Sequence, residues 1–190
     1  MAFSVATIKR NIGPATIYYG CTRPADRTPI ALGTGGVPTG GTDIGATQGE
    51  ATFNYVPTVQ GVEIEQVQGP VAPHLVSEQL TITFTMMERD YTKMAQALGM
   101  GTTLTDGGLN RVHLGGNTNV PTACWALVAK SSDEDTYDVG LIYDGYVTLG
   151  PIAWKRGEAR GIQVTITAQA VSGRTVGDTL GQFLDDIVPA

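Results

Sequence analysis

Basic residues are scarce in this chain. Lysine and arginine number 12 against 18 aspartates and glutamates, and the formal net charge at pH 7 is −6. A protein that reads a nucleic-acid sequence presents a basic surface to the phosphate groups, because those contacts supply much of its affinity. The shortage of basic side chains therefore argues against that class of function.

Cysteine and histidine are almost absent. Cys21 and Cys124 lie far apart, neither belongs to a C-x-x-C pair, and His74 and His113 do not complete a zinc-binding pattern with them. No metal site is expected from these residues. Two buried thiols in a reducing compartment are the favoured interpretation, and a disulfide stays open.

Long apolar runs are missing as well. The N-terminal stretch "MAFSVATIKRN" lacks the apolar centre of a signal peptide. The longest uncharged apolar run, Ala123 to Ala129, is far too short to span a bilayer. We therefore expect a soluble protein that is made in the cytoplasm and does not insert into a membrane.

The common catalytic and nucleotide-binding motifs do not occur. G-x-S-x-G and H-E-x-x-H are both missing. The stretch "GTGGVPTGG" (Gly33 to Gly41) has no lysine and hydroxyl after its last glycine, as a Walker loop needs. Pro38 stands where a dinucleotide-binding loop needs its third glycine. We interpret this stretch as a flexible surface loop and expect no cofactor.

Two acidic groupings match functional sites only in part. "DEDTYD" (Asp133 to Asp138) lacks the central glycine and the closing glutamate of a calcium loop, so an acidic turn is favoured. Glu63 and Glu65 are expected on one strand face, about 7 Å apart, as a glycosidase pair could be. No third partner is suggested, so a solvated polar face is favoured and no enzyme is expected.

Alternation of apolar and polar residues dominates what the sequence does contain. Leu80 to Met86 alternates most strictly, with threonine at every second position, and the 25 glycines and 10 prolines suit strands joined by turns. A hairpin with its turn at Thr58 to Gly61 is expected. One or two strands bent at Asp144–Gly145 are also expected, because Asp-Gly is a strong hairpin signal. Further strands are expected at 14–20, 122–130 and 161–171, and a second glycine-rich loop at 99–119.

One helix is expected to cover the sheet. Its apolar stripe ends before Gly99, which suits a left-handed C-terminal cap. The C-terminal segment also has helical spacing, so it is a short helix or an arm that docks on a neighbour. We predict a single mainly β domain over 1–190, with candidate assembly arms at 1–13 and 173–190. The two apolar stripes are Met87, Tyr91, Met94, Ala95 and Leu98, and Val176, Leu180, Phe183, Leu184 and Ile187.

The outward faces of the four clearest strands carry no basic residue. An exposed sheet usually carries lysine, which favours solubility and discourages edge-to-edge pairing. The β-propensity of threonine accounts for part of the pattern. A sheet this neutral is also able to continue into another subunit. The outward residues are Thr52, Asn54, Glu63, Glu65, Thr81, Thr83, Thr85, Gln163, Thr165, Thr167 and Gln169.

The first half of the chain resembles the major tail tube proteins of long-tailed (siphovirus-like) bacteriophages. The resemblance rests on the order of three stretches: "GTDIGATQGEATFNYVP" (41–57), "VEIEQVQGPV" (62–71) and "EQLTITFTMMERDYTKMAQALG" (78–99). The second half agrees only as a succession of strands. The insertion "GTGGVPTGG" and the loop "DGGLNRVHLGGN" have no match in the family pattern.

The resemblance implies a fold and an assembly. The fold would be a β-sandwich or split β-barrel with one flanking α-helix, related in architecture to the type VI secretion tube proteins. Copies would close into hexameric rings that stack into the tail tube of a virion, assembled in the bacterial cytoplasm. The implied partners are further copies of the chain, the tape-measure protein, tail terminator or distal tail proteins, and DNA that passes without specific binding.

Two sets of candidate residues follow from this resemblance. A neutral or acidic wall would let DNA slide, because phosphate-binding lysines and arginines are missing from it. An alternative is a virion decoration or carbohydrate-binding module with an exposed aromatic cluster at Tyr18, Tyr19, Trp125 or Trp154. The lumen-facing candidates are Glu63, Glu65, Thr81, Thr83, Thr85, Gln163, Thr165 and Thr167, and the inter-ring or inter-subunit candidates are Gly35, Thr39, Asp43, Val59, Gln60, Gln68, Phe183 and Leu184.

Overall fold

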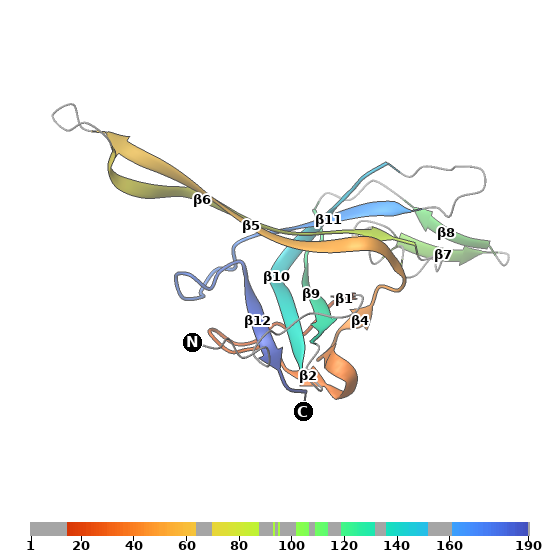
Figure 1. Cartoon of the computed structure of the whole chain (residues 1–190). Helices are drawn as coiled ribbons and strands as arrows, with labels where there is room; N and C mark the ends of the chain where they lie inside the picture. The colour runs from red at the N-terminus through yellow and green to blue at the C-terminus, as the bar shows by residue number, and fades with distance from the viewer. Residues whose placement is uncertain are drawn as a thin grey trace.

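The computed structural model is mainly β (Figure 1). It describes residues 15–63, 70–87, 93, 95, 102–106, 109–113, 119–131, 136–151 and 161–189. One antiparallel sheet runs in the order β4-β1-β9-β10-β11-β6-β5, and β12 pairs with β10. Its strands are β1 Thr16–Tyr19, β4 Thr42–Asp43, β5 Thr47–Glu63, β6 Pro70–Met86, β9 Ala123–Lys130, β10 Tyr137–Leu149, β11 Ile162–Ala168 and β12 Gly181–Ile187.

Two short ladders stand beside this sheet. One joins β2 (Leu32–Gly33) to β3 (Val37–Pro38) across the 3-10 turn η2 (Thr34–Gly36). The other joins β7 (Thr102–Asp106) to β8 (Leu109–His113). Among the described residues β4 and β5 do not pair with each other, so the main sheet is open.

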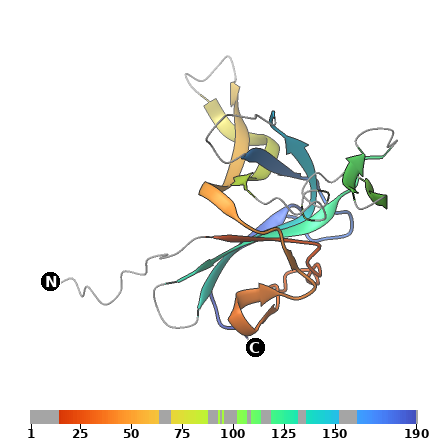
Figure 2. The same ribbon diagram turned by 90° about the vertical axis from the view of Figure 1, so that its right-hand side faces the viewer.

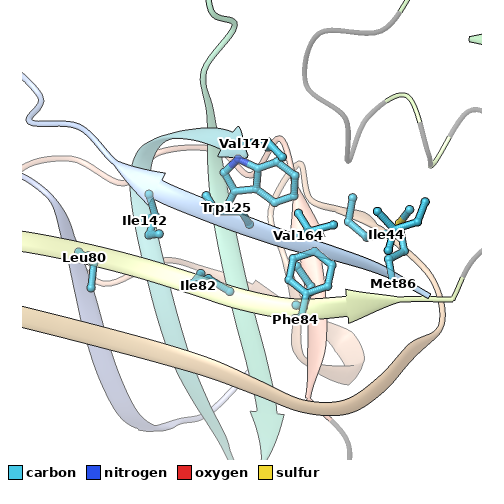
Figure 3. Packing of buried hydrophobic residues seen from close by; sticks show 12 residues of the cluster. Ile44, Leu80, Ile82, Phe84, Met86, Trp125, Ile142, Val147 and Val164 are labelled. Carbon is cyan, nitrogen blue, oxygen red and sulfur yellow. The ribbon is translucent and has the colours of Figure 1, made fainter. Parts of the chain in front are cut away.

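The alternation in β6 is confirmed. Leu80, Ile82, Phe84 and Met86 are each at most 3% exposed, while the threonines between them are half-buried. Figure 3 shows these side chains directed into a core that they share with Trp125 of β9. Burial of each large apolar side chain stabilises the fold by about 1.5–3 kcal/mol. This first core therefore fixes which face of β6 is left to the solvent.

A second core lies on the other face of β1, β9 and β10. Trp125 contributes to the first core, whereas Cys124 and Ala126 on either side of it belong to the second. The segment that contains β2 and β3 covers this side, opposite the β5–β6 hairpin (Figure 2). Ile30 and Leu32, each 2% exposed, anchor the segment there. Because β9 is buried on both faces, residues 122–130 form a nearly continuous apolar sequence.

The glycine-rich stretch Gly33 to Gly41 is folded, so the predicted flexible loop is wrong. Gly35 and Gly36 both adopt φ of +77°, which lets the chain turn tightly through η2. Farther along, Ile44 is fully buried in the first core. Apolar anchors on both sides of the glycines hold the stretch against the sheet, and the glycines supply its turns.

The predicted hairpin turn at Thr58 to Gly61 is also wrong. β5 runs without a break from Thr47 to Glu63 and pairs antiparallel with β6, so Thr58 to Gly61 lie within a strand. Thr58 and Val59 are β-branched, which favours the extended backbone found there. The long hairpin projects from the sheet as a two-stranded arm (Figure 1). The term arm is used below for residues 56–63 and 70–79.

β10 is one continuous strand rather than a hairpin at Asp144–Gly145. Its first part pairs with β9 and β12, and its second part pairs with β11, with a register shift between Ile142 and Gly145. A Cβ on Gly145 would lie 2.7 Å from a methyl carbon of Ile166. Glycine is therefore required here because the backbone packs closely against Ile166 at a bend. A hairpin turn would also favour glycine, so the local sequence does not distinguish the two.

Three further predictions concern the remaining segments. The C-terminal residues form β12, which pairs with β10 of the same chain, so the predicted short helix is wrong. Gly177 and Gly181 disfavour a helix there because glycine has a low helix propensity. Part of the second glycine-rich loop is the β7–β8 hairpin, and His74 lies in β6 instead of a loop.

Most of the helix predicted from Met87 to Gly99 lies outside the described residues, and Lys93 and Ala95, which are described, are helical. The N-terminal assembly arm predicted at 1–13 lies wholly outside the described residues. In the part of the chain that the structure describes, no helix has the length and apolarity needed to cross a membrane.

Candidate functional site

Eight uncharged polar residues form one continuous face on β5, β6 and β11. Thr83 is at its centre, opposite Thr52 on one neighbouring strand and Thr165 on the other. The hydroxyl oxygens of Thr83 and Thr165 are 3.5 Å apart, and Thr52 Oγ1 lies 3.4 Å from the Thr83 carbonyl oxygen. We call this surface the threonine face: Thr52, Asn54, Thr81, Thr83, Thr85, Gln163, Thr165 and Thr167.

The register of the sheet fixes this face. Directly opposite residues in neighbouring strands project to the same side, and successive residues project to opposite sides. Ile82, Phe53 and Ile166 occupy the core side, so the residues between them must face outward. A slip of one residue in β6 would bury the threonines and expose Phe84. The core therefore determines the position of the neutral surface.

Strand β10 extends the threonine face beyond the predicted set. Tyr146 lies opposite Thr167, and Thr148 lies opposite Thr165. Neither side chain carries a charge. The strand containing them was not among the four whose outward faces were considered, so sequence reasoning missed both. Alternation with Val147, which is 7% exposed, is the signal that could have identified them.

Glu63 and Glu65 do not join this surface. Glu63 ends β5 opposite Pro70, nine positions along the strand from Asn54, which corresponds to about 30 Å. Glu65 lies outside the described residues. The structure thus brings the predicted threonines and Gln163 together, and it separates Glu63 from them.

The arm exposes apolar side chains on both of its strands. Its paired part extends for about eight residues, or about 25 Å, past the last buried position of β6. Valine and leucine side chains recur along it, with no lysine or arginine between residues 56 and 79. Such a surface is typical of a contact site. The exposed side chains are Val56 (44%), Val59 (56%), Leu75 (47%) and Val76 (54%).

A groove of about 280 Å³ lies where the arm leaves the sheet. Phe53, Tyr55 and Leu80 line one side, and residues 179–183 line the other. Phe183 is 63% exposed, with its ring centroid 6.0 Å from that of Phe53. The Tyr55 hydroxyl donates a hydrogen bond to Glu78, and this bond raises the pKa of the tyrosine. The groove therefore combines apolar side chains with the Tyr55–Glu78 pair, Thr179 and Gln182.

The inter-subunit candidates lie on three separate parts of the molecule. Gly35, Thr39 and Asp43 are exposed around η2 and β4. Val59 and Gln60 are exposed on the arm, and Phe183 is exposed in the groove. Leu184 is half-buried against the second core. Gln68 lies outside the described residues.

Three of the four aromatic residues named for a carbohydrate-binding module lie in the described part of the chain, and none of these three is fully exposed. Tyr18 is 8% and Trp125 1% exposed, because both pack in the cores. Tyr19 is half-buried, with its ring 4.9 Å from that of Trp125 in an edge-on arrangement. Trp154 lies outside the described residues.

A third acidic grouping brings Asp138 close to two aspartates that are distant from it in the sequence. Carboxylate oxygens of Asp138, Asp185 and Asp186 lie within 4.8 Å of one another. The Asp186 amide donates to Asp138 at 3.3 Å, and Thr136 donates to the Asp186 carboxylate. These contacts connect β12 to β10 and make the grouping part of the sheet.

A comparison of this chain with models of known protein families and with curated proteins finds no match. The residues themselves therefore carry the functional conclusion.

Proposed function

We propose that this chain is a structural subunit that assembles with its own copies into rings, which stack into a tube of the kind found in long-tailed bacteriophages. The observation that carries the proposal is the threonine face, a neutral surface that spans three neighbouring strands and continues onto β10. A wall of this chemistry offers DNA no cationic partner, so a duplex could slide along it.

The open edge of the sheet supports ring formation. β5 is 17 residues long, and β6 is its one paired neighbour among the described residues. A long unpaired edge promotes association through backbone hydrogen bonds, and ring closure removes such edges. Pro57 is tolerated in this strand because an edge position does not require every backbone N–H. Joining β5 to the sheet of a neighbouring copy would extend the threonine face around a ring.

The arm and the groove support contacts between copies. Covering the apolar side chains of a projecting hairpin with a second surface removes them from water and stabilises the complex. The groove beside Phe183 is a surface of matching chemistry on the same chain. Contacts of this head-to-tail kind generate rings when they close and helical filaments when they do not. We assign the arm to the contact with an adjacent copy.

In this proposal the subunit is a β-sandwich or split barrel with a flanking helix, has no catalytic role, and belongs to the virion tail. The tape-measure protein would occupy the tube before DNA, and terminator or distal tail proteins would cover its ends. The mainly β sheet and its confirmed inner alternation support this assignment.

Electron microscopy of the purified protein tests the proposal. Negative-stain images over a range of concentrations, together with light scattering after size exclusion, should show rings or tubes. A strict monomer at every concentration would contradict it. A monomer that also gives a clear hit on a glycan array would favour the binding-module alternative.

A further inference from the structure

Cys21 and Cys124 meet at an irregularity in the pairing of β1 with β9. The amides of Gly20 and Cys21 both donate to the Cys124 carbonyl oxygen, at 2.9 and 3.2 Å. Two residues on one strand thus oppose one residue on the other, and Gly20 has a φ of +71°. This is the arrangement of a β-bulge that begins with a left-handed glycine.

The bulge changes the side to which Cys21 points. In regular alternation Cys21 would project away from Tyr18, three positions earlier. Instead both residues belong to the second core, together with Cys124. The extra residue at Gly20 turns the Cys21 side chain toward the thiol across the ladder. Each cysteine is 6% exposed, so the pair is enclosed by protein.

The Cys21 thiol donates to the Tyr18 carbonyl oxygen at 3.9 Å and lies in contact with the Cys124 thiol. That contact, together with burial, raises the pKa of Cys21. The same contact lowers the pKa of Cys124 in spite of burial, and the positive charge of Arg23 adds to this effect. The Cys124 sulfur is therefore the better nucleophile, and Cys21 is its resolving partner.

We propose that Cys21 and Cys124 are a closable dithiol, which a small peroxide converts into an intramolecular disulfide inside the folded protein. Directly opposite Cβ atoms in an antiparallel ladder are about 4.5–5.5 Å apart, and a disulfide needs about 3.5–4.5 Å. A movement on the order of 1 Å at the bulge, where the chain is already irregular, would close the bond.

The reaction balances with hydrogen peroxide as the oxidant. The Cys124 thiolate attacks one peroxide oxygen, the O–O bond breaks, and a sulfenic acid and hydroxide form. The Cys21 sulfur then attacks the Cys124 sulfur and the S–O bond breaks, so the departing hydroxide takes the Cys21 thiol proton and leaves as water. The hydroxide of the first step takes the proton that Cys124 lost and becomes the second water. Two thiols and one peroxide thus give one disulfide and two waters. A small oxidant suits this site because both residues are buried.

Closure would join two distant parts of the chain. The bond would link the end of β1 to the start of β9 across most of the first two thirds of the sequence. A cross-link that closes a long loop restricts the unfolded chain far more than the folded one. The oxidised protein should therefore unfold at a higher urea concentration than the reduced protein.

The test uses the full chain, folded and treated with hydrogen peroxide. Free thiols counted after denaturation should fall from two to none, and the mass should fall by two hydrogen atoms. The chain should remain monomeric on a denaturing gel without reductant. Its urea midpoint should rise, and dithiothreitol should reverse the shift. Two remaining thiols, oxygen added to either cysteine, or disulfide-linked dimers would each overturn the proposal.

Cys21→Ala and Cys124→Ala are the matched controls. Alanine suits the apolar surroundings, and each variant keeps one thiol that cannot close a ring. Peroxide should therefore leave the urea midpoint of either variant unchanged. A rise as large as that of the wild-type protein would also overturn the proposal. If neither variant folds, the thiol count and mass of the wild-type protein decide the question.

Discussion

At the residue scale, one buried carboxylate holds two loops against the sheet. Asp178 is 8% exposed and accepts hydrogen bonds from the Tyr143 hydroxyl, from the Arg27 amide at 2.8 Å, and from Arg174 Nη2 at 2.8 Å. Arg174 also donates to the Pro24 carbonyl at 2.9 Å and stacks 3.8 Å from the centre of the Tyr143 ring. Each nitrogen of the Arg174 guanidinium and each carboxylate oxygen of Asp178 thus has a partner.

Sequence reasoning missed this group for a physical reason. Its members come from the loop around Pro24, from β10 and from the loop after β11, so no short stretch of sequence contains the pattern. Asp178 and Arg174 are four positions apart, which would read as an ordinary helical ion pair. Strand and core residues were predictable because their period is local, whereas this contact depends on how the loops fold back.

Replacing Asp178 should destabilise the fold. Asp178→Asn removes the charge that faces Arg174 within a buried group, so the free energy of unfolding at pH 7 should fall by about 2–4 kcal/mol. Urea unfolding followed by tryptophan fluorescence measures the change. Asp26→Asn is the matched control, because Asp26 joins the same loops through the Thr175 amide at 3.1 Å but is exposed. The control should lose less than about 1 kcal/mol.

The same carboxylate gives the stability a pH dependence. Burial alone would raise the pKa of Asp178, but hydrogen bonds from Tyr143, Arg27 and Arg174 outweigh it and hold that pKa well below its usual value of 3.8. Its stabilising contribution is therefore complete above about pH 4 and is lost as the pH falls further. The difference between the wild-type protein and Asp178→Asn should shrink as the pH falls from about 4 to about 2. A constant difference would contradict this explanation.

The threonine face allows a second test at the residue scale. Thr83→Lys places a cation at its centre, and the free energy of unfolding should change by less than about 1 kcal/mol because the side chain can reach solvent. Assembled particles of this variant should retain short duplex DNA at low salt, and less of it as salt rises. Wild-type particles should retain none. Ser172→Lys, in an exposed turn, controls for the added charge itself.

At the scale of elements, the strands were predictable where one face is buried and the turns were not. β6 and β11 alternate strictly because their inner residues fill the first core. The arm gave no such signal, since both of its faces are exposed and its alternation is irregular. The two glycine positions taken for turns, at Gly61 and Gly145, lie within strands. Glycine marks either a turn or a close approach, and only the packed structure distinguishes the two.

The arm can be tested without disturbing the core. Val59→Glu changes a side chain that is 56% exposed, so the stability of the subunit should change by less than about 0.5 kcal/mol. If the arm is covered in the assembly, the glutamate would be buried there without a partner, and rings or tubes should disappear. Analytical ultracentrifugation of the variant measures this loss.

Gln79→Glu adds the same charge to the other strand of the arm, at the base, where the neutral face begins. This variant should still assemble. Normal assembly of Val59→Glu would show that the arm makes no essential contact between copies.

At the scale of the whole molecule, the sheet order explains how a single chain could form part of a continuous wall. Sequence alone predicted a mainly β chain and three of the strands that carry the neutral surface. It did not show that β11 lies beside β6, because β7 to β10 separate the two strands in the sequence. That pairing places Thr165 next to Thr83 and turns separate polar stripes into one face. Long-range pairing of this kind leaves no local trace in the sequence.

A three-dimensional reconstruction of the assembled protein tests the central proposal most directly. We predict closed rings in which β5 of one copy continues the sheet of the next, with Thr83 and Thr165 on the wall of the central channel. Placement of these two threonines on the outer surface of the assembly, with charged side chains lining the channel, would contradict the proposal.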